Sequence, residues 1–333
     1  MGVGRVTKGA GLGAGLVVLI LMCLLSVWVG SRDISFSATW HVLWSDDGSV
    51  QALVIRDHRV PRTITGLLVG ASLGLAGALM QSLTRNPLAD PGLLGVEHGA
   101  AAAVVAGIAF LGVGSITGYL WFALAGALLA SLAVHGLGAA GRAASPDRLV
   151  LAGAAISAVL LAFISAMLLL DPTTFATFRF WNVGSIAGRQ MDVVARIAPV
   201  MIAGILLALG LTRPLNVLAL GAETGTALGL NNNRIRVLGG VAITLLCGAA
   251  TAAAGPIAFV GLTVPHVARA FGGSDNRWVF PYSMVLAPIL LLAADVLGRI
   301  AARPGEVEVG IVTAVLGAPV FIALVRRRKL ARL

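Results

Sequence analysis

The sequence predicts an all-α membrane protein that crosses the bilayer about ten times, and composition is the first reason. Of its 333 residues, 58% are hydrophobic and only 11% are charged, whereas roughly 25% of the residues in a soluble domain are charged. The mean hydropathy is +0.95. The second reason is that the apolar residues gather in runs of about twenty, the length of helix that crosses a hydrocarbon core.

Ten apolar windows can be counted along the chain. They lie at about 11–30, 61–82, 93–112, 118–138, 149–170, 193–211, 236–255, 257–270, 280–300 and 309–325. The first follows Arg5 and Lys8, but its length and the lack of a clear cleavage motif favour a retained helix over a signal peptide. The window at 257–270 is short and lies between glycine-containing breaks, so we expect a partial helix packed inside the bundle.

An even number of crossings places both termini on one side of the membrane. With that side cytoplasmic, the inner segments carry the larger share of Lys and Arg, including the cluster at 326–329, so the positive-inside rule predicts cytoplasmic termini. The bias is weakened by arginines at outer helix ends. The largest loops, at about 31–59 and 171–192 outside and 212–235 inside, are too short for a soluble domain. We therefore expect one transmembrane domain over residues 1–333.

Several function classes lack their sequence signatures. The net charge of +10 comes from residues between apolar runs, so it reports topology and not nucleic-acid binding. Cys23 and Cys247 lie in apolar runs without a Cys/His metal spacing. No Gly-x4-Gly-Lys-Ser/Thr motif is present, so a pump built on this chain would need its ATPase on another chain.

The stretch from Arg59 to Gly99 joins a glycine-patterned helix to a polar break. Gly66, Gly70 and Gly74 share one helix face, which lets a neighbouring backbone approach closely in lipid. The helix then breaks at Arg85-Asn86-Pro87, as membrane proteins do where something must pass or dock. A tightly packed structural helix with an ordinary loop is the alternative, and the spacing alone leaves both open.

Asp295 is an ionisable residue inside an apolar window, which makes it a functional candidate. It could belong to a proton or ion relay. Arg299 follows four residues later, however, and this spacing places both side chains on one helix face. Because no other carboxylate lies deep in an apolar window to continue a relay, we favour an internal ion pair that orients Arg299.

Two further segments each allow two interpretations. The internal segment 218–229 predicts a short helix with Glu223 and Thr224 in its first turn, either filling the interface or docking a soluble partner. The external segment 178–185, FRFWNVGS, is aromatic. It marks a membrane interface or forms a rigid wall around a ligand vestibule.

Taken together, the motifs resemble the FecCD/BtuC family, the permease subunits of ABC importers for iron–siderophore complexes, haem and cobalamin. The matching pieces are RVPRTITGLLVGASLGLAGALMQ, NPLADPGLLGV, DRLVLAG, FRFWNVGS, the segment 218–229, GPIAFVGLTVPHVAR, LLLAADVLGR and VGIVTAVLGAPVFIALVRRR. They follow the family's order over residues 59–328. The motifs TRNPLADPGLLGV and FRFWNVGS are most similar in sequence to those of siderophore permeases, particularly those for ferric enterobactin-like ligands.

The resemblance implies a large-fold (type II) ABC importer permease in the cytoplasmic membrane. Such a permease works as a dimer, with itself or with a paralogue, on two ATPase subunits that hold ATP and Mg²⁺, and an external binding lipoprotein delivers the substrate. The implied substrate is an iron–siderophore complex, with haem or cobalamin as the alternative. The chain would be a transport subunit in membrane lipid, not an enzyme. No cofactor bound directly and no nucleic acid are expected.

The resemblance also implies roles for particular residues. The residues expected to dock the binding protein are Arg59, Arg62 and Arg299, with Asp295 supporting Arg299. Those expected to couple the permease to the ATPase are Gly221, Glu223, Thr224, Leu228 and Gly229. Those expected to form the cytoplasmic gate are Asn86, Leu88, Ser145 and Pro146.

The sequence departs from the family pattern in two of these places. The coupling segment contains no arginine, and Pro146 replaces the more usual small hydroxyl residue. The rival from another class is an ion-coupled secondary transporter, which would need carboxylates near the bilayer midplane and should run without ATP.

Overall fold

The computed structural model describes residues 3–45, 48–139 and 146–330, and within these ranges the chain is helical with no strand. Ten of its helices correspond to the ten apolar windows. They are α1 (Val3–Trp28), α4 (Val60–Thr84), α5 (Val96–Leu111), α6 (Ile116–Ala139), α7 (Pro146–Leu170), α9 (Met191–Gly210), α12 (Asn232–Ala254), α13 (Val260–Gly272), α14 (Asn276–Ala301) and α15 (Val309–Leu330). Seven spans among the described residues are long and apolar enough to cross a membrane, and α5 and α15 contribute shorter apolar stretches.

The short window at 257–270 forms the partial helix expected from the sequence. Helix α13 has 13 residues, or about 20 Å at a rise of 1.5 Å per residue, against a hydrocarbon core of about 30 Å. The chain reaches it through a non-helical segment at 255–259. Most of α13 is buried, and it packs against α4 and α14. Its irregular backbone is therefore enclosed by protein, as a bilayer requires.

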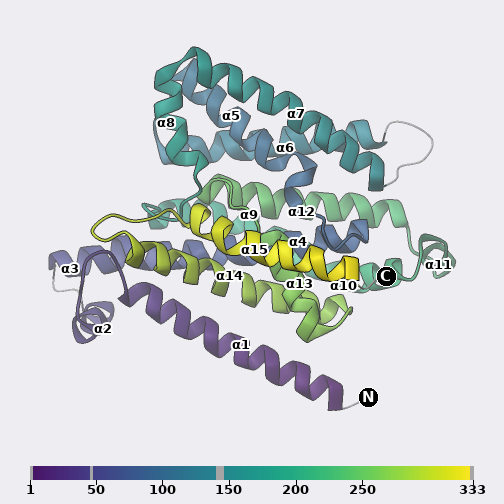
Figure 1. Cartoon of the computed structure of the whole chain (residues 1–333), viewed down its shortest axis with the longest axis horizontal. Coiled ribbons are helices and arrows are strands. Elements are labelled where there is room, and N and C mark those ends of the chain that lie inside the picture. The colour runs from purple at the N-terminus through teal and green to yellow at the C-terminus, as the bar shows by residue number, and fades with distance from the viewer. Residues whose placement is uncertain (1–2, 46–47, 140–145, 331–333) are drawn as a thin grey trace.

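The remaining helices are short. All of them lie at the two ends of the bundle except the 3-10 helix at 91–94, whose Pro91 packs inside against Gly261 of α13. They are α2 (Phe36–Trp44), α3 (Val50–Leu53), the π-helix η1 (Val54–Arg59), the 3-10 helix η2 (Pro91–Leu94), α8 (Pro172–Asn182), α10 (Thr212–Ala219) and α11 (Ala222–Ala227). Figure 1 shows α2, α3 and α8 at the end of the molecule opposite the chain termini and α11. Both termini therefore lie on one side, as the even number of crossings predicts.

The glycine face of α4 is a packing surface. A Cβ atom on Gly70 would lie 2.6 Å from the Cα of Pro288, and one on Gly74 would lie 2.6 Å from the carbonyl oxygen of Ser283. Both contacts are with α14, whose backbone passes directly over these glycines. The middle of the 59–99 stretch is thus structural, and its polar ends carry the features of interest.

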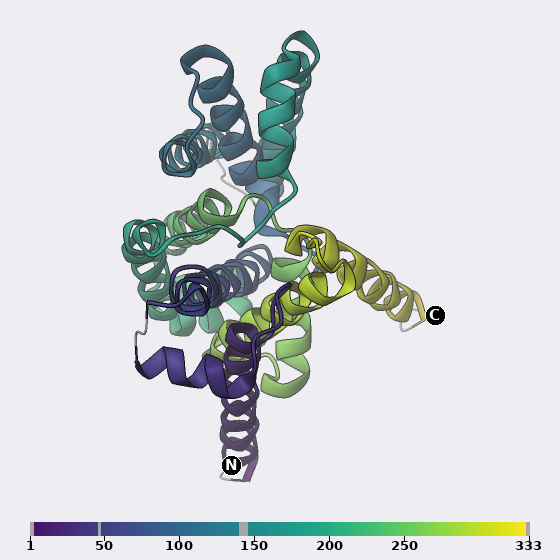
Figure 2. The same ribbon diagram turned by 90° about the vertical axis from the view of Figure 1, so that its left-hand side faces the viewer.

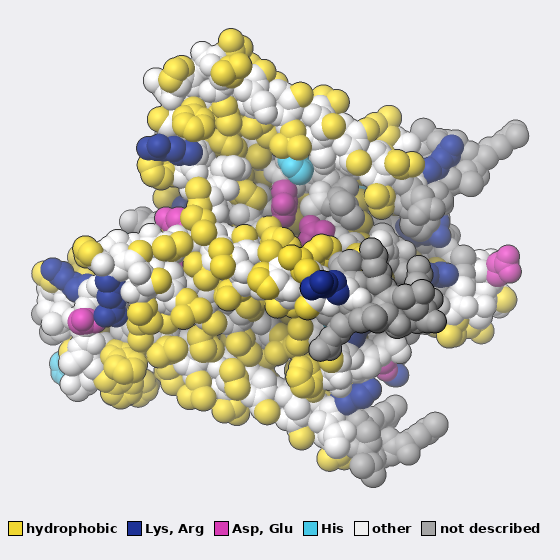
Figure 3. Space-filling view, in the orientation of Figure 1, with side chains coloured by type: hydrophobic (Ala, Val, Ile, Leu, Met, Phe, Trp, Pro, Cys, Tyr) yellow, Lys and Arg dark blue, Asp and Glu magenta, His cyan; other side chains and the backbone are white. Residues whose placement is uncertain are grey.

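The helices form two blocks, and α1 and α15 lie at the periphery. In Figure 2, α5, α6, α7 and α8 form an upper group, which packs through α5 and α6 against α12 of the block that contains α4, α12, α13 and α14, and α15 diverges to one side. Figure 3 shows apolar side chains over the middle of the molecule, with Lys and Arg gathered toward its two ends. This distribution suits a bundle surrounded by lipid, with its polar ends in water.

Candidate functional sites at the two ends of the bundle

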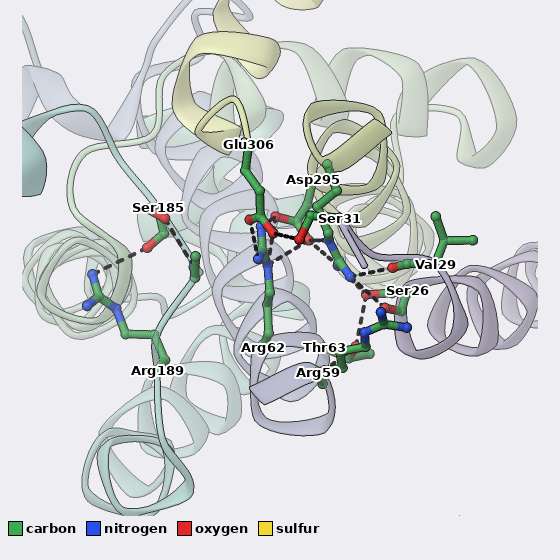
Figure 4. Close-up of polar contacts among 12 residues, drawn as sticks. Ser26, Val29, Ser31, Arg59, Arg62, Thr63, Ser185, Arg189, Asp295 and Glu306 are labelled. Carbon is green, nitrogen blue, oxygen red and sulfur yellow. Dashed lines mark hydrogen bonds and ion pairs between the residues drawn. The ribbon is translucent and has the colours of Figure 1, made fainter. Parts of the chain in front are cut away.

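Five charged side chains meet at the outer end of α1, α4 and α14, and we call them the outer arginine cluster. They are Arg59, Arg62, Asp295, Arg299 and Glu306, shown in part in Figure 4. Asp295 is only 1% exposed. It accepts hydrogen bonds from Arg62, with Nη2 at 2.7 Å, and from Arg299, with Nε at 3.0 Å. One buried carboxylate therefore ties α4 to α14, and the ion pair predicted for Asp295 and Arg299 is confirmed.

Arg62 holds a second carboxylate, which the sequence did not single out. Its Nη1 lies 2.6 Å from Oε2 of Glu306, in the outer loop between α14 and α15. Burial raises the pKa of Glu306, but the Arg62 guanidinium and the hydroxyl of Ser31 outweigh it and hold this pKa below its ordinary value. Glu306 is therefore an ionised carboxylate seated on Arg62.

The other two arginines cap the outer end of α1. Arg299 donates from Nη1 to the carbonyl oxygens of Ser26 at 2.7 Å and Val29 at 2.8 Å. Arg59 donates to the carbonyl oxygens of Trp28 and, at 2.6 Å, of Arg32. The last carbonyls of a helix lack partners within it and carry partial negative charge, so two guanidinium groups stabilise this end.

All three arginines predicted to dock a binding protein lie at the outer end, but they are buried. Arg59 is 5% exposed, Arg62 8% and Arg299 1%. Their guanidinium groups are occupied by partners within the chain, so direct docking by all three stays a prediction. A cavity of about 290 Å³, the outer pocket, reaches all three arginines, and exposed Arg32 also lines it.

The predicted coupling residues lie around α11, at the cytoplasmic end. Gly221 and Gly229 both have positive φ, at 131° and 82°, a backbone region that glycine adopts without steric cost. Glu223 and Thr224 are exposed in the first turn, and Leu228 is 63% exposed at the helix end. The segment thus presents a short helix with an apolar side chain to the cytoplasm.

Helix α10, which leads into α11, is fixed to the bundle by polar contacts. Asn216 donates from Nδ2 to Oδ1 of Asp275 at 2.6 Å and accepts from the backbone N–H of Asn276 at 2.9 Å. The hydroxyl of Ser82 on α4 donates to Oδ1 of Asn276. Hydrogen bonds, chiefly to Arg277, lower the pKa of Asp275 to about 2, so this junction stays ionised at neutral pH.

The predicted gate residues Asn86 and Leu88 form a tight cytoplasmic turn with Pro87. The Leu88 N–H donates to Oδ1 of Asn86 at 3.0 Å, the local bond that favours asparagine in turns. Both residues are exposed. Pro146 begins α7, while Ser145 lies outside the described residues. The gating role of these residues stays a prediction.

Arg85 links the gate turn to the coupling segment, a connection that sequence reasoning missed. It ends α4 with a left-handed φ of 51°, and its Nη2 lies 2.5 Å from the carbonyl oxygen of Leu218 near the end of α10. Leu218 is the first residue of the predicted coupling segment. The sequence offers one signal for this contact, which is an arginine at the end of a helix, directly before Asn-Pro.

Comparisons with known proteins identify the family. A model of the FecCD transport family matches residues 18–327. The chain belongs to this family. The ferric enterobactin transport system permease protein FepD of Escherichia coli (strain K12) is 47% identical over 325 residues, which cover 97% of each chain. The Fe(3+)-citrate import system permease protein YfmD of Bacillus subtilis (strain 168) is 41% identical, covering 94% of this chain and 93% of its own.

A solved structure supports the same conclusion. The structure reported as "An inward-facing conformation of a putative metal-chelate type ABC transporter" has a TM-score of 0.86 and 27% identity, covering 96% of this chain and 99% of its own. The predicted family, all-α fold class and multi-pass cell-membrane location are therefore confirmed. The family is one of membrane permeases, so the chain is a transport subunit.

Proposed function

We propose that this chain is the permease subunit of an ATP-driven importer that carries an iron(III)–siderophore complex into the cytoplasm. The observation that carries the proposal is 47% identity with a ferric enterobactin permease over 97% of both chains. ATP and Mg²⁺ bind to two separate ATPase subunits. A binding lipoprotein delivers the complex from outside, and a second permease, a copy or a paralogue, completes the pathway.

On the outside, a carboxylate of the binding protein enters the outer pocket and competes with Glu306 for Arg62. Two facts support this exchange: Glu306 keeps 28% of its side chain exposed, and it is held on Arg62 by one ion pair at 2.6 Å. Arg59 and Arg299 keep the wall of the pocket in place through their bonds to α1. Charge pairs at such an interface set orientation and encounter rate more than affinity.

On the inside, α11 seats on an ATPase subunit and passes its movement to the gate turn. The bond from Arg85 to Leu218 supports this route, because it joins the end of α4 to the segment that carries α11. When the ATPases close, α11 is displaced and Arg85 pulls on the turn at Asn86. The chain itself does no covalent chemistry. It forms the substrate pathway, which opens to the outside in one conformation and to the cytoplasm in the other.

Complementation tests the proposed substrate. A bacterial strain that lacks its own ferric enterobactin permease receives this chain with its neighbouring ATPase and binding protein, and uptake of radioiron-labelled ferric enterobactin, haemin and labelled cobalamin is compared. The proposal expects uptake of the siderophore complex alone. Uptake of haemin or cobalamin without siderophore uptake would replace the substrate while retaining the importer.

Docking is tested at an exposed residue, because reversal of buried Arg59 or Arg62 would also break packing. Arg32→Glu places a negative charge in the outer pocket without removing a buried cation, and Arg179→Glu on α8 is the matched control outside that pocket. ATPase activity stimulated by the loaded binding protein is expected to fall for Arg32→Glu alone. Equal stimulation of both variants and the unchanged protein would exclude the outer pocket as the docking site.

A further inference from the structure

A second, larger cavity lies beside the outer pocket and is used by none of the steps above. It measures about 580 Å³ and is lined by α6, α8, the loop 185–189 and Glu308. We call it the aromatic pocket. We propose that it is a binding site for an aromatic, anionic iron chelate, and that it is the first site on the permease that the substrate occupies after release from the binding protein. This inference rests on the proposed function and names the substrate class at one site.

Aromatic side chains form one wall of this cavity. Tyr119, Phe180 and Trp181 line it. Phe180 is 69% exposed, and the guanidinium of Arg179 lies over its ring, with Cζ 4.7 Å from the ring centroid. Trp181 is buried and packs on Phe178 at 5.7 Å between ring centroids. This is the FRFWNVGS segment, for which the sequence left open a membrane interface or a vestibule wall. The cavity favours the wall.

Helix α8, which carries Phe180 and Trp181, is capped at its N-terminus. Asp171 accepts hydrogen bonds from the N–H of Thr173 at 3.0 Å and the hydroxyl of Thr174 at 2.5 Å. These bonds lower the pKa of Asp171 to about 2, so the cap stays ionised at any physiological pH. A rigid aromatic platform loses little entropy when a ligand stacks on it.

Arg189 supplies a cation with a spare donor. It is 8% exposed and is oriented by bonds from Nε to the carbonyl oxygen of Ala253 at 2.6 Å and from Nη2 to that of Ser185 at 3.4 Å. No residue in the described part of the chain accepts a hydrogen bond from its Nη1. Figure 4 shows its guanidinium turned toward Ser185 and away from Arg62 and Glu306. A buried cation with an unused donor is suited to an anionic oxygen.

Glu308 narrows the class of ligand. It lines the same cavity and forms no ion pair with Arg189 in the described part of the chain, so the two charges face the cavity separately. Glu308 repels chelates whose exposed groups are carboxylates, and it accepts N–H donors. A catecholate complex carried on amide arms offers aromatic rings, anionic oxygens and N–H groups together. The volume also falls within the roughly 300–1,000 Å³ of small-molecule sites.

The two outer cavities share a wall, so the aromatic pocket lies next to the proposed docking site. Ala187 and Gly188 line both. Gly188 has a φ of 68°, and a Cβ there would meet no atom within 4 Å. A chelate released by a protein seated on the outer pocket would reach the aromatic pocket past these two small residues.

The test measures direct binding to the permease–ATPase complex in lipid nanodiscs, without the binding protein. The probes are radioiron-labelled ferric enterobactin and ferric citrate in equilibrium dialysis. Phe180→Ala is expected to weaken binding of the catecholate complex about three- to tenfold, the effect of one lost aromatic contact, while Phe180→Tyr retains it. Phe175→Ala, on the same helix and outside the cavity, is the matched control. Glu308→Gln is expected to tighten binding of ferric citrate, because it removes the negative charge that repels its carboxylates.

Three outcomes would overturn the assignment. They are equal affinity of Phe180→Ala and Phe175→Ala, equal affinity of the unchanged complex for ferric citrate and ferric enterobactin, and no binding of either. Uptake with the loaded binding protein is measured in parallel on the unchanged protein. If that uptake proceeds while the binding results fail, the pocket is excluded and the importer stands. If uptake itself fails, the proposed function falls.

Discussion

Asp295→Asn and Glu306→Gln should differ sharply in their effect on stability, although both remove a carboxylate from Arg62. Asp295 is 1% exposed and is shared by Arg62 and Arg299, so its neutralisation leaves two buried cations with reduced compensation. Breaking a buried pair by removing one partner costs about 3–5 kcal/mol. The side chain of Glu306 is 28% exposed, and Arg62 keeps Asp295 when Glu306 is neutralised, so the cost there is about 1 kcal/mol or less.

The free energy of unfolding of the purified permease in mixed micelles measures this difference. Asp295→Asn is expected to lower the unfolding midpoint clearly, and Glu306→Gln is expected to stay close to the unchanged protein. Arg62→Ala is the third member of the series and should resemble Asp295→Asn, because it leaves a buried carboxylate with one partner fewer. Equal midpoints for the two carboxylate variants would refute the idea that Asp295 holds the outer arginine cluster together.

Three other predictions follow from packing and from the cytoplasmic contacts. Gly126→Ala should destabilise the protein by about 1–3 kcal/mol, because the added methyl group would overlap the carbonyl oxygen of Gly99. On the same helix, the methyl group of Gly136→Ala would meet no atom within 4 Å, so this variant should be more stable by about 0.5–1 kcal/mol. The unfolding midpoints of the two variants test this difference. Arg85→Gln should lower transport about tenfold, the effect of losing a hydrogen bond from a charged group, while ATPase activity persists; equal loss of both would contradict a linking role. Leu228→Glu should prevent co-purification of the ATPase without reducing the amount of permease in the membrane, and retained co-purification would remove α11 from the interface.

The fold could be predicted because its causes are local. Apolar run length determines each crossing, and the spacing of Gly66, Gly70 and Gly74 determines which face of α4 meets another helix. The ion pair between Asp295 and Arg299 was predictable for the same reason, since four residues on a helix bring two side chains together.

The site contacts that sequence reasoning missed join residues far apart along the chain. Arg62 meets Asp295 across 233 positions and Glu306 across 244. The bond from Arg85 to Leu218 spans 133 positions. No periodicity in the sequence encodes such pairs, so the sequence predicts outward-facing arginines at helix ends where the structure has buried ones. The burial of Arg59 and Arg299 follows from the unpaired carbonyls at the end of α1, which only the packed bundle brings within reach.

The central claim is that ATP hydrolysis by partner subunits drives uptake through this chain. Proteoliposomes that contain the permease with its ATPase test this claim, with loaded binding protein outside and ATP inside, and with accumulation of radioiron-labelled ferric enterobactin as the readout. We expect accumulation only when ATP, the ATPase and the binding protein are all present. Accumulation driven by a proton gradient alone, without ATP, would contradict the account and favour an ion-coupled transporter.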